Sequence, residues 1–209
     1  MPLKSYLKKI LESRTQKSYL TWFLHNGIQN KLFYKGVQIK KFPIDLFNYQ
    51  EIIHERNVTL IIECGAWRGG STLFFSDILQ NGIVLSIDNG SQNGLWEAKR
   101  DNIKTVNGDV LGSESVNTMK DNISKTKGSV FMILDDLHTK DHVYQELVTF
   151  TPLLRKNDYL VVEDTRDRSD TLEAVQKYMK ENPTKYTHDS ARETKFGDTM
   201  AKFGFWIRN

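Results

Sequence analysis

The chain has 209 residues, a formal net charge of +3 and a pI near 8.8. This length suits one domain with an appendage and is enough to bury a substantial core. Lysines and arginines are scattered rather than clustered, which argues against nucleic acid as a partner. No apolar stretch approaches the roughly 20 residues that span a bilayer, so no membrane partner is expected. The single cysteine, Cys64, excludes a disulfide within the chain, and with a charged N-terminus unlike a signal peptide it favours a cytoplasmic location.

Residues 1–48 are predicted to form an N-terminal segment outside the main domain. Apolar residues between Leu3 and Leu24 recur at helical spacing, which predicts one or two helices. These helices could form a lid, or a subunit interface that would make the protein a homo-oligomer. Asp45 is predicted to cap a further helix.

The aromatic stretch from Phe33 to Tyr49 has two interpretations. It could cover an open edge of the sheet as part of the core. It could also form a lid over a cofactor pocket through Tyr34 and Gln50. The sequence does not separate the two.

Residues 49–209 are predicted to form an α/β domain with a doubly wound, Rossmann-like sheet. The candidate strands are Val58–Glu63, Ile83–Asp88, Ile103–Asn107, Val130–Asp135 and Tyr159–Glu163. Helical patterns lie between them at Gly70–Gln80, Leu95–Asn102, Ser113–Lys125 and Lys140–Leu154, and a last helix is predicted at Asp170–Asn182. Apolar strands flanked by helices indicate a parallel sheet buried on both faces. The alternating tail after residue 184 predicts a final antiparallel pair.

The first strand is followed by a glycine-rich turn, E-C-G-A-W-R-G-G-S, and ends in Glu63. Such a turn, leading into a helix N-terminus, can approach a ligand with its backbone, although it could also be a plain tight turn. Asp88 ends the next strand, where an acid can accept hydrogen bonds from ribose hydroxyls. Asp109 follows the third strand and is either a turn aspartate or an acceptor for the amine of an adenine ring. The glycine spacing differs from that of NAD-binding proteins.

Two further strands end in acids, Asp135 with Asp136 and Glu163 with Asp164. Adjacent parallel strands lie about 4.8 Å apart, so acids at their ends can share a cation. Asp135, Glu163 and Asp164 are hard oxygen ligands, which predicts Mg²⁺ or Mn²⁺. Alternatively, Asp136 and Asp164 only cap loops, or the acids pair with Arg166 and Arg168.

His138 lies three residues beyond Asp135 and is interpreted as a catalytic base. The alternative is a capping or buried histidine. Asp136 is expected to point to the opposite face of its strand. His142 is expected to pack or to face solvent.

Together these motifs resemble the class I S-adenosylmethionine-dependent methyltransferases. The similarity runs from about Phe33 to the C-terminus and rests on E-C-G-A-W-R-G-G-S, Asp88, the G-D at 108–109, L-D-x-x-H at 134–138 and V-E-D-T at 162–165. Among these enzymes they are most similar to the metal-dependent branch of cephalosporin hydroxylase-like proteins and macrolide-sugar and rhamnosyl O-methyltransferases.

The resemblance implies a seven-stranded sheet whose last strand is antiparallel. It also implies that Glu63, Gly65, Arg68, Gly69 and Ser71 surround the methionine part of S-adenosylmethionine, with Asp88 at the ribose and Asp109 near the adenine. It implies that Asp135, Glu163 and Asp164 bind the metal and that His138 is the base. The expected reaction is O-methylation of a sugar or similar acceptor that has neighbouring oxygens.

The sequence departs from the branch at two places near the expected acceptor. Leu137 stands where a second acid is usual, and R-D-R-S-D follows E-D-T where many members have an N-G-H-P-like stretch. The acceptor therefore stays open between a sugar, glycan, catechol or other natural product. An accessory role beside a hydroxylase and a non-catalytic nucleotide-binding relative are further alternatives, and a NAD-dependent dehydrogenase is a weaker one.

Overall fold

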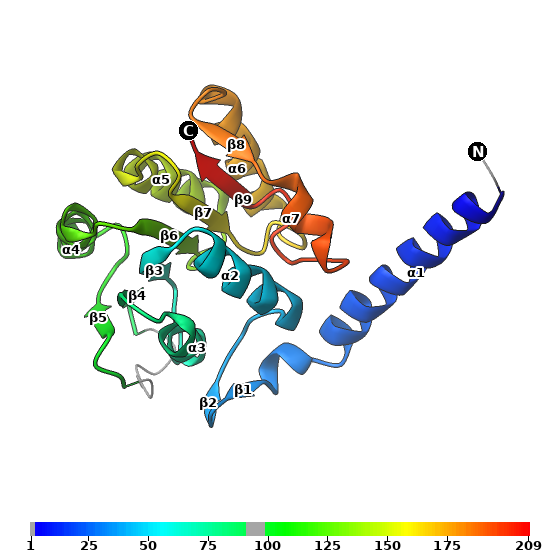
Figure 1. Ribbon diagram of the computed structural model, residues 1–209, viewed down its shortest axis with the longest axis horizontal. Helices are drawn as coiled ribbons and strands as arrows, with labels where there is room; N and C mark the ends of the chain where they lie inside the picture. Colours follow the sequence, from blue (N-terminus) through cyan, green and yellow to red (C-terminus); the bar gives the residue numbers. More distant parts are fainter. Residues whose placement is uncertain (1–2, 91–98) are drawn as a thin grey trace.

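The computed structural model describes residues 3–90 and 99–209, and its centre is a seven-stranded sheet (Figure 1). The strand order is β5-β4-β3-β6-β7-β9-β8. All strands run parallel except β9, which is antiparallel to both of its neighbours. The strands are β3 (Val58–Cys64), β4 (Ile83–Asp88), β5 (Ile103–Asn107), β6 (Ser129–Leu134), β7 (Tyr159–Val162), β8 (Tyr186–His188) and β9 (Phe205–Arg208). The predicted Rossmann-like sheet with an antiparallel last strand is confirmed.

Helices cover both faces of this sheet. The helices are α1 (Leu3–His25), α2 (Pro43–Glu55), α3 (Gly70–Ile78), α4 (Ser113–Lys125), α5 (Lys140–Phe150), α6 (Ser169–Glu181) and α7 (Ser190–Lys195). Short 3-10 turns at Ile28–Asn30 and Thr151–Leu153 and a two-residue hairpin of β1 (Phe33–Tyr34) and β2 (Val37–Gln38) complete the described elements.

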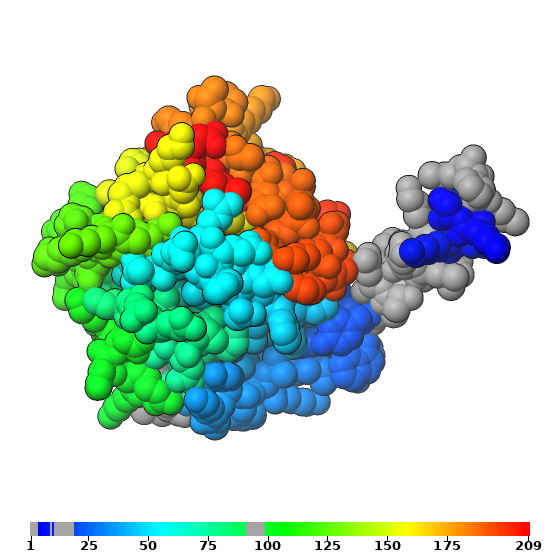
Figure 2. All heavy atoms as spheres, in the orientation of Figure 1, coloured from blue at the N-terminus to red at the C-terminus, as the bar shows by residue number. Residues whose placement is uncertain are grey.

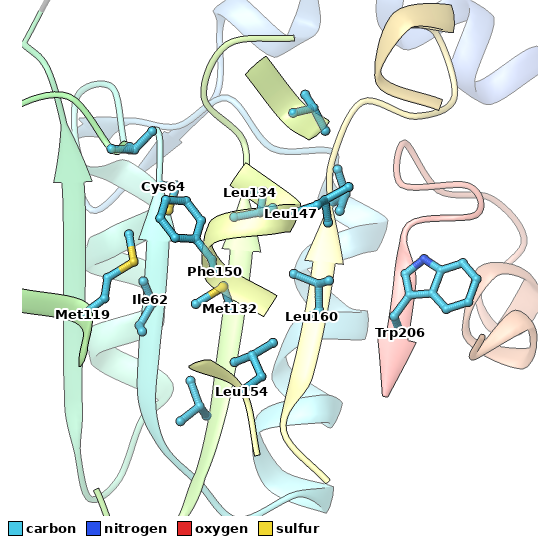
Figure 3. Close-up of a cluster of buried hydrophobic side chains, with 14 of the residues drawn as sticks. Ile62, Cys64, Met119, Met132, Leu134, Leu147, Phe150, Leu154, Leu160 and Trp206 are labelled. Atoms are coloured by element: carbon cyan, nitrogen blue, oxygen red, sulfur yellow. The ribbon is translucent and has the colours of Figure 1, made fainter. Parts of the chain in front are cut away.

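The core has two halves, one on each face of the sheet. Ile62 of β3 lies in the cluster of Figure 3 with Met119 of α4 and Leu147 of α5. Leu60 belongs to the same cluster, which residues of α6 complete. Ile61, the residue between Leu60 and Ile62, faces the side of α2 and α3. The strands are therefore apolar on both faces, as expected of a buried parallel sheet.

The N-terminal segment contains one long helix rather than two. In Figures 1 and 2, α1 extends away from the body of the protein. Near its C-terminal end Leu20 and Phe23 are buried against Phe42 and Met200. Trp22 in the same helix is 52% exposed. An exposed aromatic side chain is compatible with self-association through this helix, which stays a prediction. None of the described helices is long and apolar enough to cross a membrane.

The aromatic stretch is partly core. Tyr49 is fully buried in the α2 face of the core, whereas Phe33 and Phe47 are exposed. The predicted boundary between the N-terminal segment and the α/β domain, at residue 48, falls inside α2.

Two local predictions differ from the structure. Asp45 does not cap α2, because the helix begins after Phe42 and the Asp45 carboxylate instead accepts a hydrogen bond from the N–H of Met200 at 2.9 Å. The helix predicted over Leu95–Asn102 lies largely outside the described residues, and residues 99–102 are coil and turn.

Candidate active site

The backbone of the sheet brings its acidic strand ends to one edge. The N–H groups that follow β3, β6 and β7 extend the hydrogen bonding of the sheet: Gly65 donates to Ile87 at 2.9 Å, Asp135 to Cys64 at 2.9 Å and Glu163 to Leu134 at 3.0 Å. The residues just beyond β3, β4, β6 and β7 therefore lie side by side at the carboxyl edge.

A cavity of about 770 Å³ opens at this edge. Of the predicted site residues, those in its lining are Gly65, Asp88, Asp109, Asp135, His138, Glu163 and Asp164. Residues that the sequence did not single out also line it, among them Lys41, Trp67 and Met200. Tyr34 and Gln50, the suggested lid residues, do not.

Asp88 is held at the end of β4 by two backbone groups. Its two carboxylate oxygens accept hydrogen bonds from the N–H of Trp67 and of Gly90, each at 2.7 Å. Trp67 adopts a left-handed conformation with φ 52°, which is uncommon for a bulky residue. The turn after β3 and the acid after β4 thus form one rigid wall of the cavity.

Asp109 is both a turn aspartate and a residue of the cavity lining. One carboxylate oxygen accepts the N–H of Leu111 at 3.0 Å, as a turn aspartate does. The residue also lines the cavity, so its position suits ligand contact as well.

Glu63 lies beneath the cavity and is fully buried. Its Oε2 accepts a hydrogen bond from Thr72 at 2.6 Å. Burial raises the pKa of Glu63, while Lys41, Ser71 and Thr72 oppose that rise. Glu63 therefore connects the end of β3 to the first turn of α3 through the hydroxyl of Thr72.

Besides Glu63, three expected cofactor residues are not in the cavity lining. Gly69 has φ 83° and lets the chain turn into α3, and Ser71 is buried in the first turn of that helix. The guanidinium of Arg68 lies 5.0 Å from the centre of the Trp67 ring. Their predicted contacts with a cofactor stay predictions.

On the other side of the cavity, His138 joins two of the expected metal ligands. Its Nε2 lies 3.3 Å from Oδ1 of Asp135 and 3.1 Å from Oδ2 of Asp164. Ligand atoms of the three residues lie within 4.8 Å of one another, a spacing that could hold a metal ion. Asp164 has φ 56°, a strained conformation of the kind found at functional sites.

The two acids also set the charge of the histidine. Burial lowers the pKa of His138, but the nearby carboxylates of Asp135 and Asp164 outweigh it and raise the pKa to about 10. In this arrangement the imidazole is a cation at neutral pH.

Glu163 is paired with a lysine that the sequence analysis missed. The Nζ of Lys41 lies 2.7 Å from Oε1 of Glu163 and also contacts Oδ2 of Asp135. Burial raises the pKa of Glu163, and the lysine opposes this. Glu163 is therefore separate from the Asp135–His138–Asp164 cluster, although all three expected ligands lie at the same edge.

A second cluster of acids surrounds His142. Its Nε2 lies 3.1 Å from Oδ2 of Asp136 and 4.0 Å from Oε2 of the buried Glu146. Asp136 and His142 both line the cavity, so the expectation that His142 merely packs or faces solvent is wrong. The pair ties the loop after β6 to the first turn of α5.

The loop after β7 places its two arginines differently. Arg166 donates a hydrogen bond to Asp198 at 2.8 Å, whereas Arg168 lines the cavity beside Asp167. Neither forms an ion pair with Asp135, Glu163 or Asp164 among the described residues, although the charge of Arg168 helps to lower the pKa of Asp164. The alternative in which the arginines pair directly with these acids is therefore not what the structure has.

The cavity wall is acidic although the chain as a whole is basic. Its carboxylate side chains outnumber its lysines and arginines, and they are Asp88, Asp109, Asp135, Asp136, Glu163, Asp164 and Asp167. Such a wall attracts cations.

Comparison with known proteins identifies this arrangement. Residues 26–209 match the family Rhamnosyl O-methyltransferase/CmcI. The chain belongs to this family. The predicted resemblance is therefore confirmed, and with it the class of S-adenosylmethionine-dependent O-methyltransferases.

Two curated members are similar over most of their length. The Rhamnosyl O-methyltransferase of Mycobacterium tuberculosis H37Rv is 36% identical, over 92% of this chain and 84% of the relative. The Rhamnosyl O-methyltransferase of Mycobacterium leprae is 37% identical, over 92% of this chain and 90% of the relative.

Solved structures share the fold. The structure of CmcI with Mg and SAM has a TM-score of 0.68 at 17% identity, over 86% of this chain and 77% of that chain. The O-methyltransferase NovP has a TM-score of 0.53 at 14% identity, over 79% of each chain.

A substitution at Gly65 tests how closely the turn after β3 approaches the backbone of Asp135 after β6. A Cβ at this position would overlap the backbone carbonyl of Asp135, and its φ of 83° disfavours any side chain. We expect Gly65→Ala to lower the free energy of unfolding by about 2 kcal/mol or more, measured by urea denaturation. Gly108→Ala is the matched control because a Cβ there meets nothing within 4 Å. Equal stability of the two variants would contradict the close approach.

His138 gives the metal-free protein a predictable pH dependence. Because its pKa is raised to about 10 from about 6.5 in an unfolded chain, its stabilisation is complete below about pH 6.5 and is lost as the pH rises towards 10. In the presence of chelator, the difference in free energy of unfolding between the wild type and His138→Gln should shrink over this range. A difference that does not vary with pH would refute the assigned ion pairs.

Proposed function

We propose that this O-methyltransferase transfers a methyl group from S-adenosylmethionine to a hydroxyl of a sugar, with a divalent metal at Asp135, Glu163 and Asp164. The observation that carries the proposal is the single cavity that holds Asp88 and Asp109 on one wall and Asp135, His138 and Asp164 on the other. Such a cavity can bring a methyl donor and an acceptor together.

The residues fit the two bound groups. The donor carries positive charge on its sulfonium and its amine, and the cavity wall is acidic. The expected metal ligands are carboxylates, which suit Mg²⁺ or Mn²⁺. Oε1 of Glu163 is buried and lies 2.7 Å from the ammonium of Lys41, so this oxygen already faces a positive charge.

Bound at these residues, the two groups would supply an electrophilic methyl group and a divalent cation that lowers the pKa of an acceptor hydroxyl. His138 accepts the hydroxyl proton at Nε2. The acceptor oxygen forms a bond to the methyl carbon, and the electrons of the carbon–sulfur bond stay on sulfur. Asp135 and Asp164 orient the imidazole.

His138 must be neutral to act as a base. Neutralisation of Asp135 and Asp164 by a cation would weaken the interactions that raise its pKa, so the base becomes available when the site is filled. This requirement links proton transfer to occupancy of the site.

The sugar acceptor is supported by the mycobacterial rhamnosyl O-methyltransferases, which align with nearly the whole chain. A deoxyhexose with adjacent hydroxyls offers the pair of oxygens that the site requires. Leu137, Asp167 and Arg168 line the cavity near His138 and are our candidates for acceptor contacts.

The first test is a screen of methyl transfer by mass spectrometry. Rhamnosides, nucleotide sugars, glycans and catechols are offered with S-adenosylmethionine and Mg²⁺, and we expect the gain of one methyl group on a sugar. Asp135→Asn or a chelator should lower turnover by about 100-fold or more while donor binding by calorimetry is largely retained. Asp141→Asn, at an exposed position at the start of α5, is the control. Full turnover in chelator would remove the metal from the proposal, and methylation of catechols alone would remove the sugar.

The second test concerns the base. His138→Gln should lower kcat by about 100-fold or more, with donor affinity unchanged. Part of the loss should be recovered at high pH, where more of the hydroxyl ionises on its own. His54→Gln, an exposed histidine outside this cavity, is the control. Wild-type turnover in His138→Gln would rule out this base.

A further inference from the structure

Lys41 is a buried cation in the middle of the acidic edge. It is 2% exposed. Its Nζ contacts Oδ2 of Asp135, lies 2.7 Å from Oε1 of Glu163 and is 3.9 Å from Oε1 of Glu63. A lysine is almost never buried unless it is paired, so these carboxylates hold the ammonium in place.

The backbone around Lys41 is anchored. Phe42, the next residue, packs edge-on against Phe23 with the ring centres 5.1 Å apart and precedes the first turn of α2. Lys40, on the other side, is exposed and lies 4.3 Å from the ring centre of Trp67. Of two consecutive lysines, only Lys41 is therefore directed at the acids.

The ammonium lies where it competes with the proposed metal. Asp135 and Glu163 are two of the three expected ligands, and Lys41 contacts both. The other oxygen of Asp135 is 3.3 Å from His138. A cation shared by Asp135, Glu163 and Asp164 would meet the positive charge of Lys41 at contact distance, which is strongly unfavourable.

We propose that Lys41 is the resident counter-ion of the metal site: it holds Asp135 and Glu163 together in the metal-free protein and leaves them when a divalent cation binds. This inference rests on the proposed function, because it takes the same acids as ligands. The cavity gives the ammonium a place to move, since Lys41 itself forms part of its lining. The metal-ligand set of three acids is completed by that movement.

Charge balance supports the exchange. Four carboxyl groups gather here, Glu63, Asp135, Glu163 and Asp164. Among the described residues, Lys41 and His138 are the cations that contact them, and Arg168 adds a positive charge near Asp164. With all four ionised, a negative charge remains for a divalent cation. Lys41 therefore prevents the acids from repelling one another when the metal is absent, at the cost of weaker metal binding.

The experiment is a calorimetric titration with Mn²⁺ in the presence of S-adenosylhomocysteine. Lys41→Met removes the charge and keeps an unbranched chain, and it should bind Mn²⁺ at least about tenfold more tightly than the wild type. Lys40→Met, the matched control, loses the same charge one residue away and should change the affinity by less than about threefold. Equal or weaker binding by Lys41→Met would overturn the proposal.

A second measurement does not depend on that variant folding. The ¹⁵N resonance of the Lys41 ammonium in the wild-type protein, assigned through its loss in Lys41→Arg, should shift as Mg²⁺ is added. The dissociation constant from this shift should equal the one from a calorimetric titration of the same protein with Mg²⁺. A resonance that stays unchanged at saturating Mg²⁺ would show that the ammonium does not move, and the proposal would fail.

The two proposals fail in different ways. Metal-dependent methyl transfer by the wild type, with Mn²⁺ binding unaffected by Lys41→Met, would refute the counter-ion alone. If neither protein binds Mn²⁺ while both bind the donor, the metal is removed from the proposed function and the counter-ion role falls with it.

Discussion

Mutual repulsion of carboxylates at the carboxyl edge of a buried parallel sheet is the constraint on which this site depends. Glu63 lies near the end of β3, and Asp135 and Glu163 directly follow β6 and β7, so the register of these three adjacent strands brings the acids together. Their charges are tolerable only because cationic groups lie among them. In this chain Lys41 and His138 are those cations. Under our proposals, the same two residues determine how a metal binds and when the base becomes neutral.

Much of the fold and the acidic half of the site could be predicted from local pattern. Apolar strands that end in acids are visible in the sequence, and parallel pairing places those ends at one edge, which the hydrogen bonds after Cys64 and Leu134 bear out. The tail from residue 184 was also predictable, because its alternation shows an antiparallel pair. Those features follow from periodicity and from strand ends, both of which are local properties.

The features that could not be predicted depend on contacts between distant segments. Lys41 meets Asp135 across 94 residues, and nothing in its neighbourhood distinguishes it from Lys40. Aspartate is a residue type that often caps helices, but the Asp45 carboxylate instead accepts a hydrogen bond from the N–H of Met200, which is distant in the sequence. His142 lies in α5, and its contact with Asp136 forms only because the loop after β6 brings that acid close to the helix.

The account is tested most directly by a crystal structure of the protein with Mn²⁺ and S-adenosylhomocysteine, in which manganese is located by its anomalous scattering. The account predicts a single peak at coordination distance, about 2.2 Å, from carboxylate oxygens of Asp135, Glu163 and Asp164, with the Lys41 ammonium withdrawn from Asp135. The account would be contradicted if manganese lay at the Asp136–His142–Glu146 cluster or elsewhere and Lys41 stayed paired with Asp135.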